Sequence, residues 1–414
     1  MFYVGFHWLH RETMSTVDTP VVIIGAGPAG LTAARVLTEL DIDYMLLSRE
    51  KEPGVNKACA GFIPSGALRD FNIDTLPGAH PVTTVRMKFP RQDMQTVEFG
   101  AKVGVNVSRA NLGMTMLKYV GIGSGEMRLQ TEVGHVSVKQ SGCELTLHKH
   151  GQSEKLTSEI VIDASGVNPV SLKTVQLRER LPDHLMGYTA QYQMRRPSSM
   201  DALNGVNDFY YGSDFSPNGY AWVFPRGHDI AVGTGGLLRL FKEEKKCMFD
   251  YIYHLITHDD SAKATLENSE VIKRESALVP LAGVVQPSFT DRLMLAGDAA
   301  AQCCPITGEG IHYSMIGGEL AAQTAAHAVK KQDYSAQILS RYEKDWIKAI
   351  GSNLKWGRWL QKKMVESTFG GLGTSLIGSD RSCRIVAEML VGARSVRSTL
   401  LAAAPTYMAK KLRR

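Results

Sequence analysis

The stretch VVIIGAGPAGLTAARVLTEL, residues 21–40, decides the fold expected for this chain of 414 residues. It opens on a short run of β-branched apolar residues, 21–24, which predicts a buried strand. LTAARVLTEL, 31–40, has its apolar residues at helical spacing, and 44–47 reads as a second apolar strand. The order of strand, glycine-rich turn, helix and strand predicts a βαβ unit.

The turn of this unit, GAGPAG at 25–30, matches the pattern G-x-G-x-x-G. In that pattern the first glycine makes the tight turn, the second lets the backbone approach a pyrophosphate, and the third lets helix and strand pack closely. The helix N-terminus then faces the phosphates. The strand–turn–helix context favours a dinucleotide site over a tight turn of another kind, with the residues Gly25, Gly27, Ala29 and Gly30.

The end of the second strand is where the adenosine ribose is expected, and an acidic residue is usual there. The spacing points instead to Ser48, followed by Arg49 and Glu50. A serine hydroxyl still donates or accepts a hydrogen bond, so Ser48 and Arg49 are the candidates, but the ribose contact stays open.

A second segment, LMLAGDAA at 293–300, favours FAD over a nicotinamide dinucleotide. A buried strand ending in Gly297-Asp298 puts a carboxylate where it can hold a ribityl chain. The segment PITGEG, 305–310, then opens a helix through about residue 329, which aims backbone N–H groups at a flavin. The candidates here are Gly297, Asp298, Gly308, Gly310 and Ile311; a simple N-cap role for Asp298 is the alternative.

Composition excludes several classes of function. No run of 18 apolar residues exists, so no membrane span is expected. Six cysteines lie scattered without a C-x-x-C pair, which argues against a zinc site or disulfides and for the cytoplasm. The net charge of +6 resides in residues 384–414, which have seven basic residues and one acid. No nucleic-acid partner is expected, whereas this basic tail can lie on an anionic membrane on its inner face, or pack as a solvated helix.

The stretch SPNGYAWVFP, 216–225, has an unusual alternation of aromatic residues. In a strand, Tyr220, Trp222 and Phe224 share one face, and Pro225 is expected to stop the strand from continuing centrally. Seven residues later, Gly233 and Gly235 offer bare backbone for a close approach. An aromatic stripe is often ordinary core, so alternation alone does not establish a binding wall.

Several of these motifs together resemble the FAD-dependent superfamily that includes the aromatic hydroxylases. They are GAGPAG, Val107-Ser108-Arg109 before a helix, and LMLAGDAA. Residues 217–235 are similar to the signature P-x-x-Y-x-W-x-F-P-x7-G-x-G of the geranylgeranyl reductases, and KACAGFIPSGALRDFNI, 57–73, is similar to that family's cysteine loop, with Ala60 in place of a glycine. The resemblance covers roughly 20–345.

The resemblance implies an α/β fold of mixed type, in which a Rossmann-type FAD-binding domain is interleaved with an antiparallel-sheet substrate domain. The boundaries expected are an extension at 1–19, FAD-binding segments at 20–80, 101–180 and 285–330, lipid-binding segments at 81–100 and 181–284, and a helical region at 331–414. Residues 1–13 lack signal-peptide features, and Met14 is an alternative start. Trp346, Trp356 and Trp359 are expected to be packing residues.

The resemblance also implies reduction of C=C bonds in prenyl chains, with Arg109 near the FAD and the wall Tyr220, Trp222, Phe224, Pro225, Gly233 and Gly235 around the lipid. Cys59 is the candidate proton donor, because a protonated thiol can donate; a buried apolar role is the alternative. Candidate substrates are digeranylgeranylglycerol phospholipids, geranylgeranyl diphosphate, geranylgeranylated (bacterio)chlorophyll and polyprenyl quinones, and we favour a lipid or diphosphate. The electron donor is NAD(P)H or a carrier protein such as ferredoxin.

Two rival hypotheses remain from the sequence. A flavin monooxygenase or halogenase has the same scaffold, but DASGVNPVSLKT, 163–174, lacks the Asp-Gly pair and arginine of the related hydroxylases. A non-catalytic lipid carrier with a vestigial cofactor site has only the altered position Ser48 in its favour.

Overall fold

The computed structural model describes residues 17–55, 57–121, 123, 125–196, 204–365 and 380–412, with side chains as far as Ala404. Residues 1–16 of the expected N-terminal extension, 1–19, and the side chains of residues 405–414 of the basic tail therefore lie outside the described residues. Within the described part, no helix is both long and apolar enough to cross a bilayer.

An eight-stranded sheet with a parallel centre forms the first half of the molecule. Its apolar strands are buried on both faces, as expected for parallel strands covered on either side. The residues Val21 and Ile23 face a helical layer, whereas Val22 and Ile24 face an antiparallel ribbon. The strand order is β17 (Phe289–Thr290), β18 (Leu293–Leu295), β11 (Gln152–Asp163), β1 (Thr19–Ile24), β2 (Tyr44–Leu47) and β8 (Gly125–Arg128), and the ribbon is β9 (Glu132–Lys139) with β10 (Gly142–Lys149) on β11.

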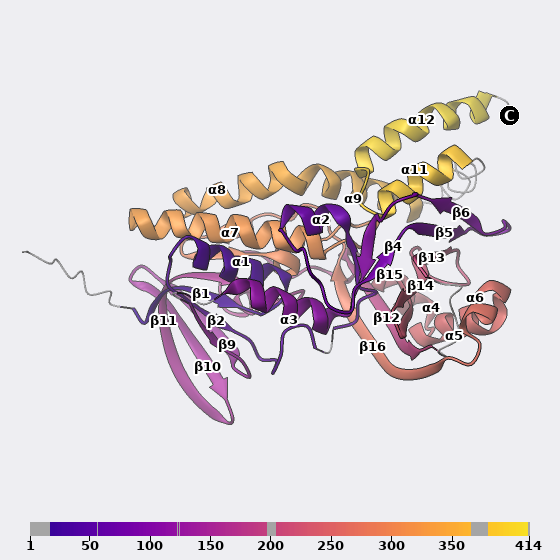
Figure 1. Cartoon of the computed structure of the whole chain (residues 1–414). Helices are drawn as coiled ribbons and strands as arrows, with labels where there is room; N and C mark the ends of the chain where they lie inside the picture. The colour runs from indigo at the N-terminus through magenta and orange to yellow at the C-terminus, as the bar shows by residue number, and fades with distance from the viewer. Residues whose placement is uncertain are drawn as a thin grey trace, which may run out of the picture.

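Helices cover the first face of this sheet. Helix α1 packs between α3 and α7, and α8 packs on the outside of α7 (Figure 1). Small residues allow the close crossing of α1 and α7, because a Cβ on Gly318 would lie 2.1 Å from the carbonyl oxygen of Ala29. The helices are α1 (Pro28–Glu39), α3 (Arg109–Val120), α7 (Ile311–Lys331) and α8 (Ala336–Trp346).

A seven-stranded sheet forms the second half. It is antiparallel except for one parallel pair, β13 with β5. The strand order is β16 (Glu270–Pro280), β12 (Met186–Arg195), β15 (Asp229–Leu237), β14 (Tyr220–Arg226), β13 (Val206–Tyr211), β5 (Thr84–Lys88) and β6 (Gln95–Glu98). Four of these strands, β12 to β15, lie between residues 186 and 237, within the segment 181–284 expected to form an antiparallel sheet.

The two faces of this second sheet have different partners. One face packs on α4 (Leu238–Glu244), α5 (Met248–His258) and α6 (Asp260–Leu266). The opposite face has Phe209, Trp222 and Phe224, and α11 (Asp380–Leu390) packs against it. A small sheet of β3 (Phe62–Pro64), β7 (Gly104–Asn106) and β4 (His80–Val82) and the helix α2 (Ser65–Asp70) lie beside it.

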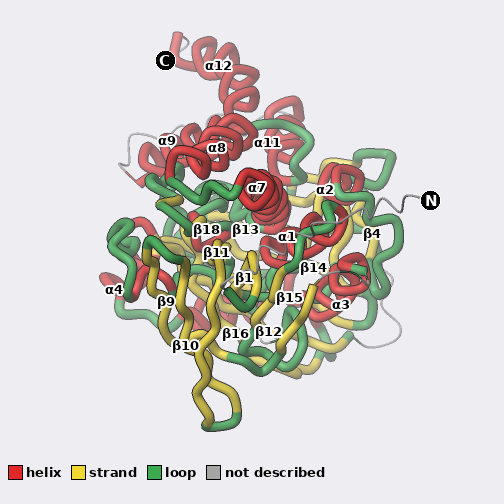
Figure 2. The backbone as a smooth tube through the Cα atoms, turned by 90° about the vertical axis from the view of Figure 1, so that its left-hand side faces the viewer, coloured by secondary structure: helices red, strands yellow, loops and turns green. Residues whose placement is uncertain are grey.

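The C-terminal region is helical where it is described, as expected. A short π-helical stretch, Ile347–Gly351, links α8 to α9 (Ser352–Val365), and α12 (Val396–Leu412) follows α11. Figure 2 shows α12 projecting beyond the body of the molecule. Trp346 is fully buried, in agreement with its expected packing role, but Trp356 and Trp359 are 38% and 42% exposed. For these two residues the packing interpretation is wrong, since α9 turns them outward.

The expectation for Pro225 is confirmed. Strand β14 lies between β13 and β15, but from Phe224 to its end at Arg226 it is paired with β15 alone, so it does not continue centrally through the proline. Pairing between β13 and β14 ends at Val223, so the missing N–H of the proline breaks no bond of that ladder. The Pro225 carbonyl accepts a hydrogen bond from the Asn106 side chain instead (2.8 Å).

Candidate functional site

The carboxyl ends of four parallel strands meet at one edge of the eight-stranded sheet. Ile24 pairs with Leu47 on one side and Asp163 on the other, and Asp163 pairs with Leu295. Strand β1 lies in the middle of this group: β2 follows it on one side, and the later strands β11 and β18 lie on the other side. In open α/β sheets, ligands bind outside this edge, where the strand order reverses. The glycine-rich turns after β1 and β18 both begin there.

The turn after β1 has the geometry of a phosphate cradle. Gly25 has φ +105°, and a Cβ there would lie 2.5 Å from the carbonyl oxygen of Ala164. A Cβ on Gly30 would lie 1.8 Å from the Gly25 oxygen, whereas one on Gly27 would meet no atom within 4 Å. Gly27 also caps α1 without a side-chain hydrogen bond. The first and third glycines are therefore required by the fold, and the open space at Gly27 fits a pyrophosphate.

The residues at the end of β2 are arranged around a carboxylate. Ser48 is buried, and its hydroxyl accepts a hydrogen bond from the backbone N–H of Glu50 (3.3 Å). The Glu50 carboxylate lies 3.5 Å from the Arg49 guanidinium and 3.7 Å from the Lys57 amine. The acidic group usual near a ribose is thus present two residues after Ser48. The sequence interpretation passed over Glu50 because it counted only the first position after the strand.

The turn after β18 places a second carboxylate at the site. Burial raises the pKa of Asp298, and the cations Arg109 and Lys57 oppose that rise. Among the described residues, no donor forms a hydrogen bond with this carboxylate. A half-buried acceptor that lacks a protein donor fits a polyhydroxyl chain such as the ribityl group. Of the other residues expected here, Ala29 and Gly297 pack against each other, with 3.0 Å between the Ala29 Cβ and a Cβ built on Gly297.

The start of α7 lies beside Asp298. Gly310 caps α7 without a side-chain hydrogen bond, and a Cβ on Gly310 would lie 3.7 Å from an Asp298 carboxylate oxygen. Gly308 has φ +71° and an exposed backbone. Free N–H groups at this end of a helix of 21 residues favour an anionic or polar ligand group.

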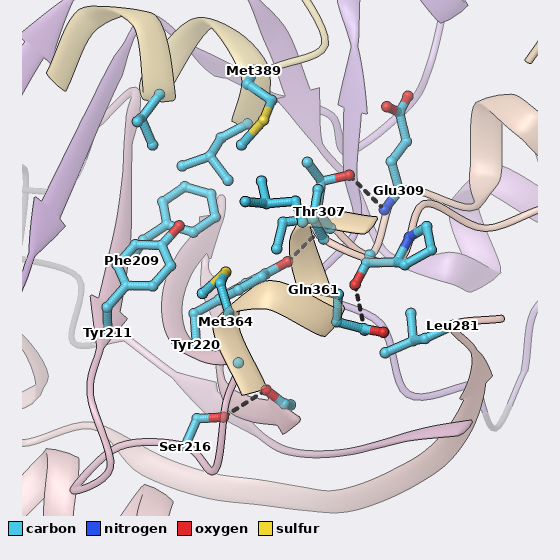
Figure 3. A pocket seen from close by; sticks show the side chains of 18 of the residues that line it. Phe209, Tyr211, Ser216, Tyr220, Leu281, Thr307, Glu309, Gln361, Met364 and Met389 are labelled. Carbon is cyan, nitrogen blue, oxygen red and sulfur yellow. Dashed lines mark hydrogen bonds between the residues drawn. The ribbon is translucent and has the colours of Figure 1, made fainter. Parts of the chain in front are cut away.

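A cavity of about 880 Å³ adjoins this loop, and apolar side chains make up most of its wall. Of the residues expected to bind cofactor or substrate, it is lined by Cys59, Tyr220, Trp222, Phe224, Gly235, Gly308, Gly310 and Ile311. Figure 3 shows Phe209 and Tyr211 beside Tyr220, against which their rings pack, with Met364 of α9 and Met389 of α11 on other sides of the cavity. A cavity of this size and character suits a long apolar ligand.

Two residues expected in the wall lie outside it. Pro225 and Gly233 do not line the cavity. A Cβ on Gly233 would lie 2.3 Å from the Trp222 ring, and Trp222 pairs with Gly233 across the hairpin just as Tyr220 pairs with Gly235. Gly233 therefore makes room for the Trp222 ring on the neighbouring strand, whereas a Cβ on Gly235 would first meet the Thr189 methyl group at 2.9 Å.

Tyr220 connects the aromatic wall to the loop before α7. Its hydroxyl donates a hydrogen bond to the Thr307 carbonyl at 2.6 Å (Figure 3). Burial raises the pKa of Tyr220, and the thiols Cys303, Cys304 and Cys59 add to that effect. A phenol that is neutral and already donating shapes the cavity and is not a proton source for it.

The three thiols near Tyr220 differ in their access to the cavity. Cys59 is half-buried and lines it. Cys303 and Cys304 are 1% exposed, do not line it, and have pKa values raised by burial. Their burial is that of packing residues.

The sequence interpretation missed the part of the cavity formed by the C-terminal helices. Helices α9, α11 and α12 supply about a third of the lining, including Gln361, whose amide donates to the Pro305 carbonyl (2.8 Å). No sequence motif in the C-terminal region indicated that these residues would line a cavity. The only available signal was the abundance of Met and Trp on helices that follow a lipid-binding signature.

A second cluster that was missed holds the loop before α7 against α2. His312 lies between Glu309 (3.6 Å) and Asp70 (3.0 Å). Burial lowers the pKa of His312, but the carboxylates of Glu309 and Asp70 outweigh it, so the pKa is raised. When protonated, the imidazole of His312 links the start of α7 to α2 through these two carboxylates.

This cluster predicts a pH dependence of stability. A histidine whose pKa is raised on folding stabilises the protein fully below its unfolded pKa and loses that effect as pH rises through the folded pKa. The free energy of unfolding should therefore fall as pH rises from about 6.5 past the folded value. Urea titrations at a series of pH values should show this fall, and His312→Gln should flatten it. His327→Gln, on the same helix, is the control; an unchanged pH profile in His312→Gln would contradict the assignment.

Comparison with known proteins gives two family matches. Residues 186–279 match the geranylgeranyl reductase catalytic domain, and residues 18–67 match an FAD binding domain. The first match includes β12 to β15 with the aromatic hairpin, and the second includes the glycine-rich turn.

Curated relatives align with most of the chain. A digeranylgeranylglycerophospholipid reductase 1 of Methanococcoides burtonii is 28% identical over 81% of this chain and 81% of its own length. A digeranylgeranylglycerophospholipid reductase of Methanocaldococcus jannaschii is 26% identical over 89% of this chain and 94% of its own length.

Solved structures share the fold. A geranylgeranyl bacteriochlorophyll reductase-like protein of Thermoplasma acidophilum superimposes with a TM-score of 0.81 at 23% identity, covering 95% of this chain and 98% of its own. A flavin-dependent brominase superimposes with a TM-score of 0.71 at 19% identity over 95% of this chain and 98% of its own. At these identities the likeness shows the fold, which α/β flavoproteins of different activities share.

Proposed function

Because this chain belongs to the geranylgeranyl reductase family of FAD-dependent oxidoreductases, we propose that it reduces C=C bonds in the geranylgeranyl or polyprenyl chain of an isoprenoid lipid or diphosphate. The cavity is the observation that supports this most directly. Its apolar wall begins at the loop before α7, beside the glycine-rich edge, and continues under α9, α11 and α12. A long apolar chain could then lie with one of its double bonds next to the cofactor site.

The residues fit FAD as the cofactor. Gly27 leaves space for the pyrophosphate, Asp298 offers an acceptor for the ribityl hydroxyls, and Arg109 supplies a cation near that carboxylate. We assign the adenosine end to Ser48, Arg49 and Glu50. Reduced FAD, when bound, supplies the hydride. The parts expected to hold it, 20–80 with 101–180 and 285–330, include the strands and turns of that edge.

The protein has to supply a proton to the second carbon of each double bond. We assign this step to the Cys59 thiol, because it lines the cavity while Cys303 and Cys304 do not. The proton leaves sulfur as the alkene carbon gains its C–H bond, and the thiolate is reprotonated by solvent before the next turnover. The apolar wall excludes water during the step, which prevents side reactions that would compete with hydride transfer to the alkene.

Cys59→Ala tests this assignment. Positioned general acids contribute about 10²–10⁴-fold, so kcat should fall by that factor while flavin binding and flavin reduction stay unchanged. Single-turnover reduction of a geranylgeranyl substrate by the pre-reduced enzyme measures the step directly. Cys303→Ala removes a neighbouring thiol that is outside the cavity and should change the rate by only a few-fold. An unaltered rate in Cys59→Ala would overturn the assignment.

Two finer features of the proposal concern the head group and the electron donor. Relatives named digeranylgeranylglycerophospholipid reductases favour a glycerophospholipid or diphosphate over a pigment ester or a quinone. NAD(P)H or a ferredoxin-like carrier supplies the electrons. The basic tail, 384–414, brings the protein to a membrane surface; the side chains of its residues 405–414 lie outside the described residues.

The function is tested with the purified protein under anaerobic conditions. A flavin spectrum, reoxidation of the reduced flavin by a geranylgeranyl substrate, and product masses rising in two-dalton steps would establish the activity. Comparing a phospholipid, a diphosphate, a chlorophyll ester and a quinone then names the substrate. If the reduced flavin persists until oxygen is admitted and oxygen consumption depends on an organic substrate, the enzyme is a monooxygenase or halogenase instead.

A further inference from the structure

One face of α9 combines lysine and tryptophan side chains and is amphipathic in composition. Between Ser352 and Val365 the helix has four basic residues and no acid. At about 100° per residue, the positions Lys355, Trp356, Trp359, Lys362 and Lys363 fall within an arc of roughly 120°. Leu354, Gly357 and Gln361 are buried on the opposite side.

The two indoles on this face are exposed although they are large and partly apolar. Trp356 and Trp359 are 38% and 42% exposed, and their rings form an edge-to-face pair with centroids 5.7 Å apart. Leu401 of α12 is 65% exposed. These are three of seven large hydrophobic side chains exposed in the described part of the chain, and all three come from two helices.

The same three side chains line the cavity. Trp356, Trp359 and Leu401 contribute to its wall, together with the exposed Arg397 at the start of α12. Of the exposed large apolar residues, the other four, Met114, Tyr253, Val271 and Ile272, do not line it. The apolar interior therefore reaches the protein surface between α9 and α12, and indoles stand at that opening.

We infer that the exposed face of α9, with Leu401 of α12, docks on the surface of an anionic lipid bilayer, so that a prenyl lipid enters the cavity sideways without crossing water. Indole rings partition to the boundary between head groups and acyl chains, and lysine side chains extend to the phosphates. Charge complementarity selects an anionic bilayer over a second copy of this chain, because two copies of a face without acids would repel each other. The inference rests on the proposed function for the identity of the lipid, but not for the docking itself.

Vesicle binding tests the docking. The full-length protein should sediment with vesicles of phosphatidylcholine containing about 30% phosphatidylglycerol, and more weakly with phosphatidylcholine alone. Raising the salt from about 0.1 M to about 1 M shortens the screening length from about 10 to about 3 Å and should weaken binding. Trp356→Ser with Trp359→Ser should lower the partition coefficient by roughly tenfold or more. Lys355→Glu with Lys362→Glu should act in the same direction and remove the preference for phosphatidylglycerol.

The matched control is Tyr253→Ser. Tyr253 is an aromatic residue of α5 with 64% exposure, and α5 lies on the other side of the molecule from α9 (Figure 1). This variant should bind vesicles like the unaltered protein. Equal loss in the control, or no loss in the two α9 variants, would overturn the inference. A variant with the basic residues at 410, 411, 413 and 414 changed to Gln should still show the tryptophan dependence; if it alone abolishes binding, the tail is the docking element and α9 is not.

Two further measurements report how deeply the indoles of α9 enter the bilayer and whether the protein self-associates through this face. Vesicles with brominated acyl chains should quench indole fluorescence in the unaltered protein, and Trp356→Phe with Trp359→Phe should remove that part of the quenching. If light scattering instead gives the mass of a dimer that the α9 variants dissociate, the face is a contact between copies and the inference fails. Reduction of detergent-dispersed geranylgeranyl diphosphate is measured in parallel. Reduction without vesicle binding would refute the docking alone, and vesicle binding without reduction would refute the proposed function alone.

Discussion

Gly27→Val is expected to remove flavin binding while leaving the fold of the cofactor-free protein intact. The reason is that a Cβ at this position would meet no protein atom within 4 Å, and the residue does not require a positive φ. The added side chain would instead occupy the space in front of the α1 N-terminus, where a pyrophosphate would lie. Overfilling a packed contact costs about 1–3 kcal/mol even inside a core that can relax. The Kd for FAD should therefore rise by at least roughly 5- to 150-fold.

Fluorescence titration of the apoprotein with FAD measures this effect, and thermal unfolding of the apoprotein measures the fold. Gly66→Ala provides a matched control, because it also adds carbon near the start of a helix, with only the Arg69 guanidinium 3.8 Å from the new Cβ. It should change neither quantity by much. Gly30→Ala should behave differently from both, since its Cβ would lie 1.8 Å from the Gly25 oxygen and the apoprotein itself should unfold more easily. Normal FAD affinity in Gly27→Val would show that the pyrophosphate does not lie at this turn.

Trp222→Ala is expected to destabilise the protein by about 3–5 kcal/mol, which is the usual cost of removing a buried Trp. Trp222 is 6% exposed, belongs to the core of the second sheet and packs edge-to-face on Tyr220 with centroids 6.0 Å apart. Its ring occupies the space that a side chain at Gly233 would need. Gly233→Ala should accordingly cost about 1–3 kcal/mol through overpacking.

The double variant should be more stable than the sum of the two changes predicts, because removing the indole relieves the two closest contacts of the new methyl group, although the Ala190 carbonyl oxygen 2.7 Å away stays in place. A coupling of about 0.5–3 kcal/mol is the range seen for residues in contact. Urea unfolding of the four proteins in the cycle measures it. Gly205→Ala, at a turn far from the indole, combined with Trp222→Ala should show no coupling. Strict additivity for Gly233 would mean that the signature glycine has a purpose other than accommodating the ring.

The sequence predicted the elements whose signals are local. Strands β1 and β2 and the turn between β1 and α1 follow from apolar runs and glycine spacing, and the structure confirms all three. The signature at 217–235 could also be recognised from the sequence, but the structural reason for its residue spacing is visible only in the structure. The interval between the aromatic residues and the glycines sets the hairpin register, which pairs Trp222 with Gly233. The fixed spacing between the aromatic residues and the glycines in the sequence therefore corresponds to their pairing across β14 and β15.

Features that depend on contacts between distant segments were not predictable. Trp356 and Trp359 have the helical spacing of core residues, and only the docking of α9 on the rest of the chain decides that they face outward. The cluster of His312 with Glu309 and Asp70 joins residues about 240 apart, and nothing in either segment alone marks it.

The composition of the cavity wall has a consequence for biosynthesis. Helices α9, α11 and α12 come from the last stretch of the chain, so they leave the ribosome after both sheets have been made. Until they pack, the face with Phe209, Trp222 and Phe224 is an uncovered aromatic surface on an otherwise complete domain. Nascent chains that pause before residue 352 should therefore recruit chaperones or aggregate, because transiently exposed apolar surface drives both. The lipid itself, arriving early, would shield the same surface.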